Sequence, residues 1–163
     1  MTLAVAAMPP HRLLKEYREL QTSSPDPDIT LDLKDDADIH EWSVLLKGPT
    51  GSPYEGGTFE LLVHCPVTYP LAPPKVVFVT PVFHPNVMFT TGEICLDILK
   101  KDAWTPAWTL MTVCRAIVLL LSHPEADSPL NCDCGNLIRN GDMRGYRSMA
   151  KMYTALRAIG AEL

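Results

Sequence analysis

The sequence predicts an α+β fold in which a four-stranded antiparallel sheet packs against helices. Apolar residues recur at helical spacing near both ends of the chain, whereas four short runs between residues 29 and 79 alternate between apolar and polar residues. Short connections between these runs favour an antiparallel meander. A long segment without either period, residues 81–108, precedes the C-terminal helices. We expect residues 1–163 to form a single domain, because globular domains most often contain ~100–150 residues.

The first element is an amphipathic helix over residues 9–21. Its apolar positions, which recur at helical spacing between charged residues, are Leu13, Leu14, Tyr17 and Leu20. Pro9 and Pro10 suit a helix start, and residues 22–28 (TSSPDPD) are rich in residue types that end a helix. Residues 1–8 carry no basic residue and are too short for a signal peptide, so we expect a flexible tail there.

The four strands are predicted from alternation. They span residues 29–33, 42–46, 59–64 and 76–79. Between the second and third runs lie residues 48–53 (GPTGSP) and 55–57 (EGG), which are typical of turns. Eight of the 15 prolines fall between Pro49 and Pro85, where they exclude long strands or helices.

Residues 81–108 show neither period, and a loop of that length inside a compact domain is usually functional or disordered. Its aromatic residues indicate that it is packed; they are Phe83, Phe89, Trp104 and Trp108. Three helices are expected to follow, over residues 109–121, 133–140 and 142–159. Asp142 is the candidate N-cap of the last helix.

Composition excludes several classes of protein. The net charge is −5 and no basic run occurs, which argues against nucleic acid as a partner. No apolar run approaches the ~20 residues that a membrane-spanning helix needs, so direct membrane insertion is not expected. Five cysteines in a chain of this length are too few for a disulfide scaffold, and an odd number of cysteines cannot all be paired. We therefore expect a cytosolic protein with at least one free thiol.

The long loop contains the candidate nucleophile. Cys95 follows the sequence His84-Pro85-Asn86 at a distance of nine residues from Asn86. A thiolate is an attacking group, and a side-chain amide can stabilise the oxyanion that forms when a carbonyl is attacked. The residue types alone leave alternatives open: Cys95 as a small buried apolar residue, and His84 as either a catalytic base or a structural residue that holds the loop.

The other cysteines are weaker candidates. Cys65 ends a strand and Cys114 lies in an apolar helix, so both are expected in the core. Cys132 and Cys134 form a C-x-C pair, but a structural zinc site needs four ligands and His123 is the one histidine nearby. We expect no metal site.

Four blocks of sequence together resemble the ubiquitin-conjugating enzymes. They are residues 69–76 (YPLAPPKV), 83–86 (FHPN), 92–99 (GEICLDIL) and 104–108 (WTPAW). Their order and spacing agree with that family, as does the plan of helices and strands. The combination of His-Pro-Asn with Ile-Cys-Leu is the most specific part, and the resemblance covers about residues 9–160.

The resemblance implies a ubiquitin-conjugating-enzyme-like fold and a thioester mechanism. Cys95 would accept ubiquitin from an activating enzyme and pass it to a protein acceptor with a RING-type ubiquitin ligase. No cofactor is implied for this chain, because the separate activating enzyme consumes the ATP. Asn86 would support the oxyanion, directly or by holding the active-site loop, and His84 and Pro85 would be structural.

The segment Asp127-Ser128-Pro129-Leu130-Asn131 resembles the family's gate beside the cysteine. Family members often have a carboxylate there that orients or deprotonates the incoming lysine, and Ser128 falls at that position. Serine is a poor base, so either Asp127 replaces the carboxylate or Ser128 only shapes the site. The alternative is that both residues merely cap and turn the loop. Leu130 would pack beside the incoming tail or lysine.

The same resemblance implies a partner surface. The residues expected to contact activating enzyme and ligases are Arg12, Lys15, Leu71, Pro106 and Ala107. Together they would form a small apolar patch with a basic rim. The alternative for the three loop residues is ordinary loop packing.

Residues 128–142 look most like the peroxisome-associated member of the family, a peroxin. This implies that the acceptor is a peroxisomal import receptor, modified on lysine or cysteine. It also implies a peroxisomal membrane anchor protein bound to the C-terminal helices (142–163), and a location at the cytosolic face of that membrane. The alternatives are other cytosolic substrates, a ubiquitin-like modifier, a Cys–His hydrolase, or a non-catalytic binding variant, which the presence of Cys95 disfavours.

Overall fold

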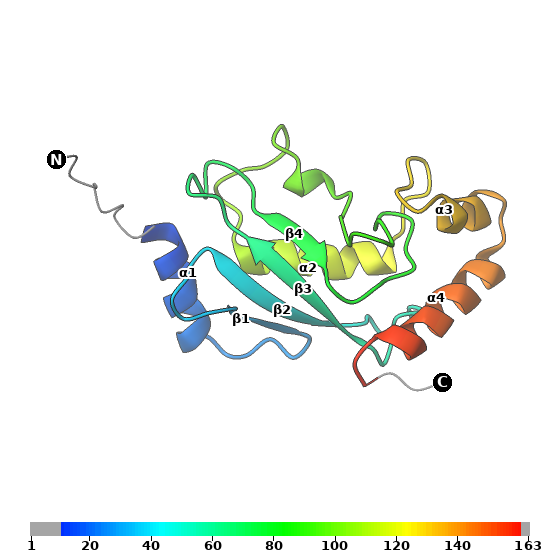
Figure 1. Cartoon of the computed structure of the whole chain (residues 1–163), viewed down its shortest axis with the longest axis horizontal. Helices are drawn as coiled ribbons and strands as arrows, with labels where there is room; N and C mark the ends of the chain where they lie inside the picture. The colour runs from blue at the N-terminus through cyan, green and yellow to red at the C-terminus, as the bar shows by residue number, and fades with distance from the viewer. Residues whose placement is uncertain (1–10, 161–163) are drawn as a thin grey trace.

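The computed structural model describes residues 11–160, and the expected flexible tail and Pro9–Pro10 helix start lie outside that range. The elements in chain order are α1 (His11–Thr22), β1 (Ile29–Leu33), β2 (Glu41–Lys47), β3 (Thr58–His64), β4 (Lys75–Phe78), the 3₁₀ turn η1 (Asp97–Leu99), α2 (Leu110–Ser122), α3 (Cys132–Arg139) and α4 (Met143–Arg157). The predicted α+β fold is confirmed. Helix α1 and the α3–α4 pair lie at opposite ends of the long axis (Figure 1).

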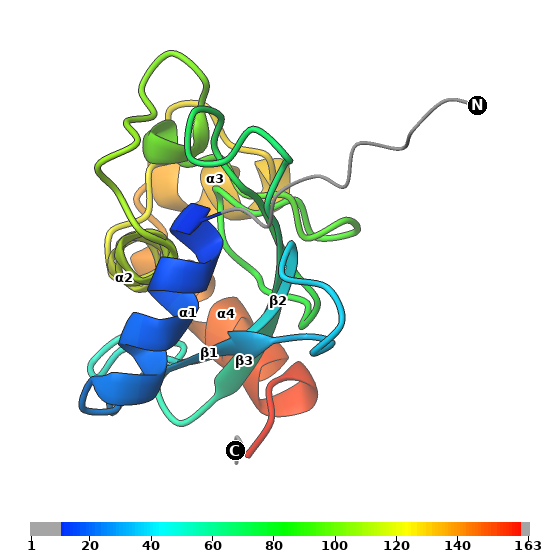
Figure 2. The same cartoon turned by 90° about the vertical axis from the view of Figure 1, so that its left-hand side faces the viewer.

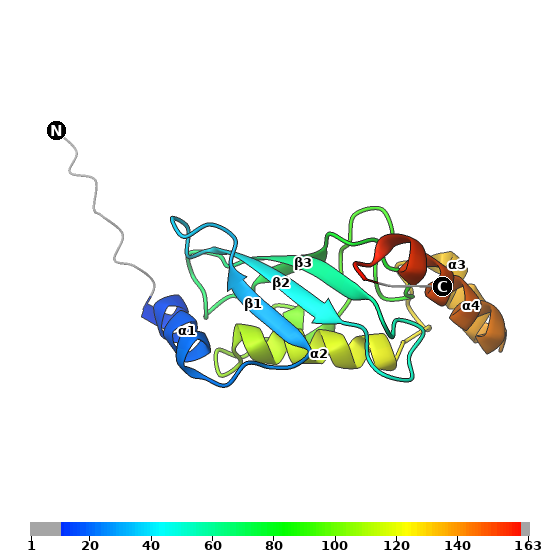
Figure 3. The same cartoon turned by 90° about the horizontal axis from the view of Figure 1, so that it is seen from below.

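The sheet is a four-stranded antiparallel meander in the order β1-β2-β3-β4, as predicted. One ladder across it shows why the alternation was informative. Leu31 pairs with Val44, Val44 with Leu61, and Leu61 with Phe78, so four apolar side chains share one face. Helix α2 crosses that face (Figure 3).

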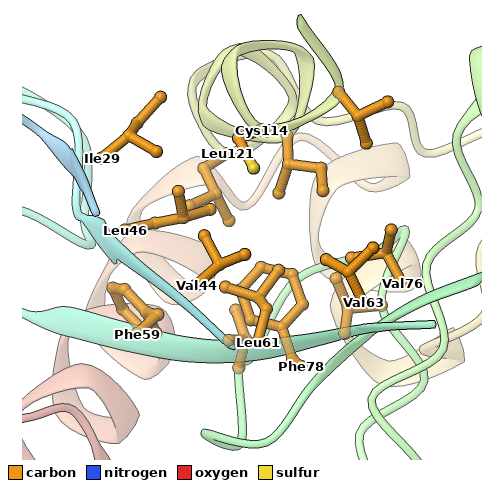
Figure 4. Close-up of a cluster of buried hydrophobic side chains, with 14 of the residues drawn as sticks. Ile29, Val44, Leu46, Phe59, Leu61, Val63, Val76, Phe78, Cys114 and Leu121 are labelled. Atoms are coloured by element: carbon orange, nitrogen blue, oxygen red, sulfur yellow. The ribbon is translucent and has the colours of Figure 1, made fainter. Parts of the chain in front are cut away.

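The core lies between this face of the sheet and α2. Figure 4 shows Val44, Leu61 and Val63 of the sheet directed toward Cys114 and Leu121 of α2. Cys65, Cys114 and Cys134 are buried as free thiols, and burial raises the pKa of each, to about 12 for Cys114 and Cys134. The expected core positions of Cys65 and Cys114 are confirmed.

The helix ends differ by one or two residues from the predictions, and capping explains most of the differences. Helix α2 begins at Leu110 because the preceding Thr109 side chain accepts a hydrogen bond from the N–H of Thr112 at 3.2 Å. Asp142 caps α4 as predicted. That helix ends at Arg157 because Ile159 instead exchanges two backbone hydrogen bonds of 2.9 Å with Thr58 at the start of β3.

The long loop after β4 is packed, as its aromatic residues indicated: Phe83 and Trp104 are buried. It doubles back beside β4, where Phe78 N–H donates to the carbonyl of Gly92 at 2.9 Å. Gly92 has φ +73°, and a Cβ there would lie 1.9 Å from the Phe78 oxygen, so the close approach requires glycine. Within residues 11–160, no helix has the length and apolarity needed to cross a membrane.

Candidate active site

Cys95 lies where the long loop returns toward its own beginning. Its backbone N–H donates to the carbonyl of Asn86 at 2.8 Å, and the strand-like pairing of Val87 with Ile94 precedes it. The Cys95 residue is half-buried, in contrast to the three core cysteines. The folded loop therefore brings together the two motifs, His-Pro-Asn and Ile-Cys-Leu, that are separated in the sequence.

Two grooves meet at Cys95. The helix-side groove, about 380 Å³, lies between Cys95 and α2 and includes Leu119, Glu125 and Ser128 in its walls. The sheet-side groove, about 510 Å³, lies between Cys95 and the start of β4 and includes Leu130. The thiol is thus approachable from two directions.

The Asn86 side chain holds residues 125–131, which comprise the expected gate and the two residues before it and are called the gate segment from here on. Asn86 is 4% exposed, its Nδ2 donates to the Glu125 carbonyl at 2.8 Å, and its Oδ1 accepts from the Glu125 N–H at 2.9 Å. Because its own carbonyl accepts from Cys95, Asn86 connects the gate segment to the cysteine. Of the two roles implied for Asn86, holding the active-site loop is the one that these contacts support.

Pro85 provides a second attachment for the same segment. Its carbonyl oxygen accepts hydrogen bonds from the N–H groups of Leu130, at 2.8 Å, and Asn131, at 3.1 Å. Pro85 itself is buried. The gate is therefore held at both ends, at Glu125 by a side chain and at Leu130 by a backbone carbonyl, which fits the structural role implied for Pro85.

His84 has the surroundings of a structural residue. Its side chain is fully buried, its Nε2 donates to the Leu120 carbonyl at 3.0 Å, and its Nδ1 accepts from the N–H of Asn86 at 3.0 Å. Burial lowers the pKa of the imidazole to about 4. Because both ring nitrogens are occupied, this geometry favours the structural interpretation over a Cys–His hydrolase.

Only some of the polar side chains of the gate segment line a groove beside Cys95. Ser128 lines the helix-side groove, whereas Asp127 is exposed and lines neither groove. Glu125, which sequence reasoning did not single out, is the gate carboxylate in the helix-side groove. Its signal was available only as an acidic residue two positions before Asp127. Lys100, in the same groove, pairs with Asp97 at 2.5 Å, and this hydrogen bond raises the pKa of Lys100.

The expected partner residues come together near the N-terminal end of the fold. Leu71 is 79% exposed, Pro106 and Ala107 are exposed, and Lys15 is exposed on α1, three residues after Arg12. Arg12 is half-buried, whereas a residue of the expected basic rim would be exposed. Its guanidinium donates to the carbonyls of Pro106 at 2.8 Å and Trp108 at 2.7 Å, so most of its hydrogen-bonding capacity is used internally.

Comparisons with known proteins agree with this geometry. A family model described as "Ubiquitin-conjugating enzyme" matches residues 12–154. Protein PEROXIN-4 of Arabidopsis thaliana is 61% identical over 149 residues, which cover 91% of this chain and 94% of the relative. Ubiquitin-conjugating enzyme E2 pex4 of Dictyostelium discoideum is 56% identical over 145 residues, covering 89% and 96%.

The fold is also similar to solved structures. The H. polymorpha ubiquitin-conjugating enzyme Pex4p, solved in complex with the soluble domain of Pex22p, is 38% identical with a TM-score of 0.84, covering 90% of this chain and 96% of that one. The E2 domain of a Toxoplasma gondii ubiquitin-conjugating enzyme is 37% identical with a TM-score of 0.80, covering 90% and 97%.

Proposed function

This chain belongs to the ubiquitin-conjugating enzyme family, and we propose that it carries ubiquitin as a thioester on Cys95. The observation that carries this assignment is the position of a half-buried thiol at the point where two grooves meet. Cys132, the exposed cysteine at the start of α3, lines neither groove. A reactive cysteine needs access for its partners, which the core thiols lack.

The reaction has two transfers at Cys95. In the first, its thiolate attacks the carbonyl carbon of the thioester on the activating enzyme; a new C–S bond forms and the activating enzyme's sulfur leaves. In the second, the acceptor nucleophile attacks the same carbonyl carbon and Cys95 leaves as the thiolate. When the acceptor is an amine, its proton must pass to a base or to water.

Two grooves suit a reaction with two macromolecular partners. An extended ubiquitin tail needs one path to Cys95, and the acceptor needs another so that it can reach the carbonyl without displacing the tail. Asn86 and Pro85 keep the shared wall, residues 125–131, in place while both are bound. We assign Asn86 and Pro85 to this task, and Leu130 to packing in the sheet-side groove.

The carboxylate that assists the acceptor amine is a separate assignment. Ser128 lines the helix-side groove and shapes it, but a hydroxyl does not accept a proton near neutral pH. Glu125 supplies a carboxylate in that groove, whereas Asp127 lines neither groove. We therefore favour Glu125 for this role, and the expectation for Asp127 stays a prediction.

We further propose that the acceptor is a peroxisomal import receptor and that the enzyme works at the cytosolic face of the peroxisomal membrane. The similarity to plant and amoebal peroxin-4 proteins supports this, as does the similarity to a Pex4p that was solved with the soluble domain of Pex22p. An anchor protein would then hold the enzyme at the membrane.

Helix α4 offers a surface for such an anchor. Its exposed large apolar residues Met152 and Leu156 are four positions apart and so share one face of the helix, and the exposed Ile159 follows the helix end. They lie at the opposite end of the molecule from α1 and the expected ligase surface (Figures 1 and 3). An anchor on α4 would therefore leave the activating enzyme and a RING-type ligase free to bind.

Charging with ubiquitin tests the chemistry. After incubation with activating enzyme, ATP and ubiquitin, a non-reducing gel should show an adduct that a thiol reductant removes. Cys95→Ala should abolish the adduct, and the matched variant Cys132→Ala should retain it. An adduct that persists in Cys95→Ala would refute the assignment. Preferential charging with a ubiquitin-like modifier would show that this modifier, and not ubiquitin, is the substrate.

Fractionation tests the location and the anchor surface. The protein should sediment with peroxisomal membranes, and Leu156→Asp should release it without changing its charging. Leu71→Asp, at the opposite end of the fold, should remain on the membrane. A uniformly cytosolic wild-type protein would contradict the peroxisomal proposal.

A further inference from the structure

Glu16 is a buried carboxylate with no part in the chemistry at Cys95. It lies in the middle of α1 and is 4% exposed, which makes it the one buried acidic residue within residues 11–160. Its Oε1 accepts hydrogen bonds from Arg12 Nε at 2.6 Å and from the Tyr69 hydroxyl at 2.7 Å, and its Oε2 accepts from the N–H of Leu110 at 2.8 Å. A buried charge is tolerated only with such complete pairing.

These bonds join three segments that are far apart in the sequence. Tyr69 lies in the loop before Leu71, and Leu110 is the first residue of α2. Figure 2 looks from the end of the molecule that carries α1 and shows α2 nearly end-on beside it. Glu16 therefore connects α1 with both loops that carry the expected partner residues.

Arg12 and Trp104 complete the network. Arg12 donates to the carbonyls of Pro106 and Trp108, as described above, and Trp104 Nε1 donates to the Pro70 carbonyl at 2.7 Å. The Tyr69 and Trp104 rings also pack with their centroids 6.0 Å apart. The two partner-facing loops are thus attached to each other and to α1.

We propose that Glu16 and Arg12 are positioning residues, which hold the surface formed by Leu71, Pro106 and Ala107 in the shape that partners bind. Lys15, which is exposed, then supplies the direct positive contact that the family resemblance also attributes to Arg12. This inference rests on the proposed function, because the partners concerned are the activating enzyme and RING-type ligases.

The substitution Glu16→Gln separates positioning from direct contact. An amide has one acceptor oxygen, so it cannot accept from both Leu110 and Arg12, and its NH₂ group would face one of these donors. Arg12 would keep its charge but would no longer face an ionised partner. If Arg12 bound partners directly, Glu16→Gln would leave binding unchanged or strengthen it; if Arg12 positions the loop, binding must weaken.

The substitution Arg12→Lys gives an independent test with the charge retained. An ammonium is a point donor and cannot reproduce the fork that reaches Glu16, Pro106 and Trp108 together. The positioning role predicts that Arg12→Lys behaves like Glu16→Gln. Their double variant should be no worse than either single variant, because both remove the same network.

The experiment measures the rate at which activating enzyme charges the full chain with ubiquitin, over a range of concentrations of this chain. The resulting KM is that of the activating enzyme for this chain. Glu16→Gln and Arg12→Lys should each raise KM roughly tenfold, the cost of ordering one or two groups on binding, and leave kcat unchanged. The control Asp36→Asn makes the same charge change at an exposed site between β1 and β2 and should leave both constants unchanged. Hydrogen exchange of the 104–110 backbone should quicken in the two network variants alone.

An unchanged KM in a folded Glu16→Gln would overturn the inference, as would a loss confined to kcat. If Glu16→Gln fails to fold, Arg12→Lys decides, and a wild-type KM there would overturn the inference too. Failure of the wild-type chain to charge at all would instead refute the proposed function.

Discussion

Mild acid should destabilise this fold through His84. Its folded-state pKa of about 4 lies below the ordinary value of 6.5, because burial disfavours the charged form of the ring. The unfolded chain therefore binds a proton that the folded chain does not. The stability from neutral His84 is fully present above pH 6.5 and is lost as the pH falls. The loss is roughly 1–2 kcal/mol at about pH 5.5 and roughly 3 kcal/mol near pH 4.

Urea unfolding at about pH 7 and about pH 5.5 measures this loss. The wild-type free energy of unfolding should fall between these conditions, and His84→Gln, which has no proton to gain, should lose that part of the pH dependence. His123→Gln is the matched control because His123 is an exposed histidine. Its pH dependence should match that of the wild type.

An NMR titration of the His84 ring gives the direct result. A midpoint near pH 4 agrees with a buried imidazole whose two nitrogens are hydrogen-bonded. A midpoint near 6.5, or an equal pH dependence in His84→Gln, would show that the ring is accessible to protons. His84 would then return as a candidate base for Cys95.

Three other predictions concern the gate and the loop that carries Cys95. Asn86→Ala removes both hydrogen bonds to the main chain of Glu125 and should lower the free energy of unfolding by roughly 1–3 kcal/mol, measured in urea, while slowing discharge of charged ubiquitin. Glu125→Gln should slow single-turnover discharge to free lysine about tenfold or more, but not discharge to hydroxylamine, which is already unprotonated at pH 7. An equal or larger lysine-specific effect of Asp127→Asn would move the role to Asp127. Gly92→Ala should lower the unfolding free energy by on the order of 3 kcal/mol or more in a thermal melt. Gly51→Ala shares the positive φ but has open space, so it should cost less.

The strands were predictable, and Cys95 could be proposed as the nucleophile, because their signals are local. Alternation along residues 29–79 reports which side chains face the core, and the pairing of Leu31, Val44, Leu61 and Phe78 follows from it. The N-cap at Asp142 was readable for the same reason. The predicted helix to residue 159 was too long, because Ile159 finds its hydrogen-bond partner in β3 rather than in its own helix.

The role of Arg12 shows where local signals end. The resemblance placed it on the rim of a binding surface, but its guanidinium reaches carbonyls 94 and 96 residues away. Glu125 was overlooked for the same reason, since its attachment to Asn86 spans 39 residues. Contacts between residues so far apart along the chain produce no periodicity or motif in the sequence.

The sequence by itself determined the fold class and the family and singled out Cys95 as the candidate nucleophile, because periodicity and motif spacing depend on residues that are near neighbours along the chain. The tertiary structure alone decided which polar groups satisfy one another: His84 with Leu120, and Glu16 with Tyr69 and Leu110. Buried polar groups must be paired, but any of many donors and acceptors meets that requirement in principle. The packing of the sheet against α2 selects among them, and so determines whether a side chain reacts, binds or holds the site in place.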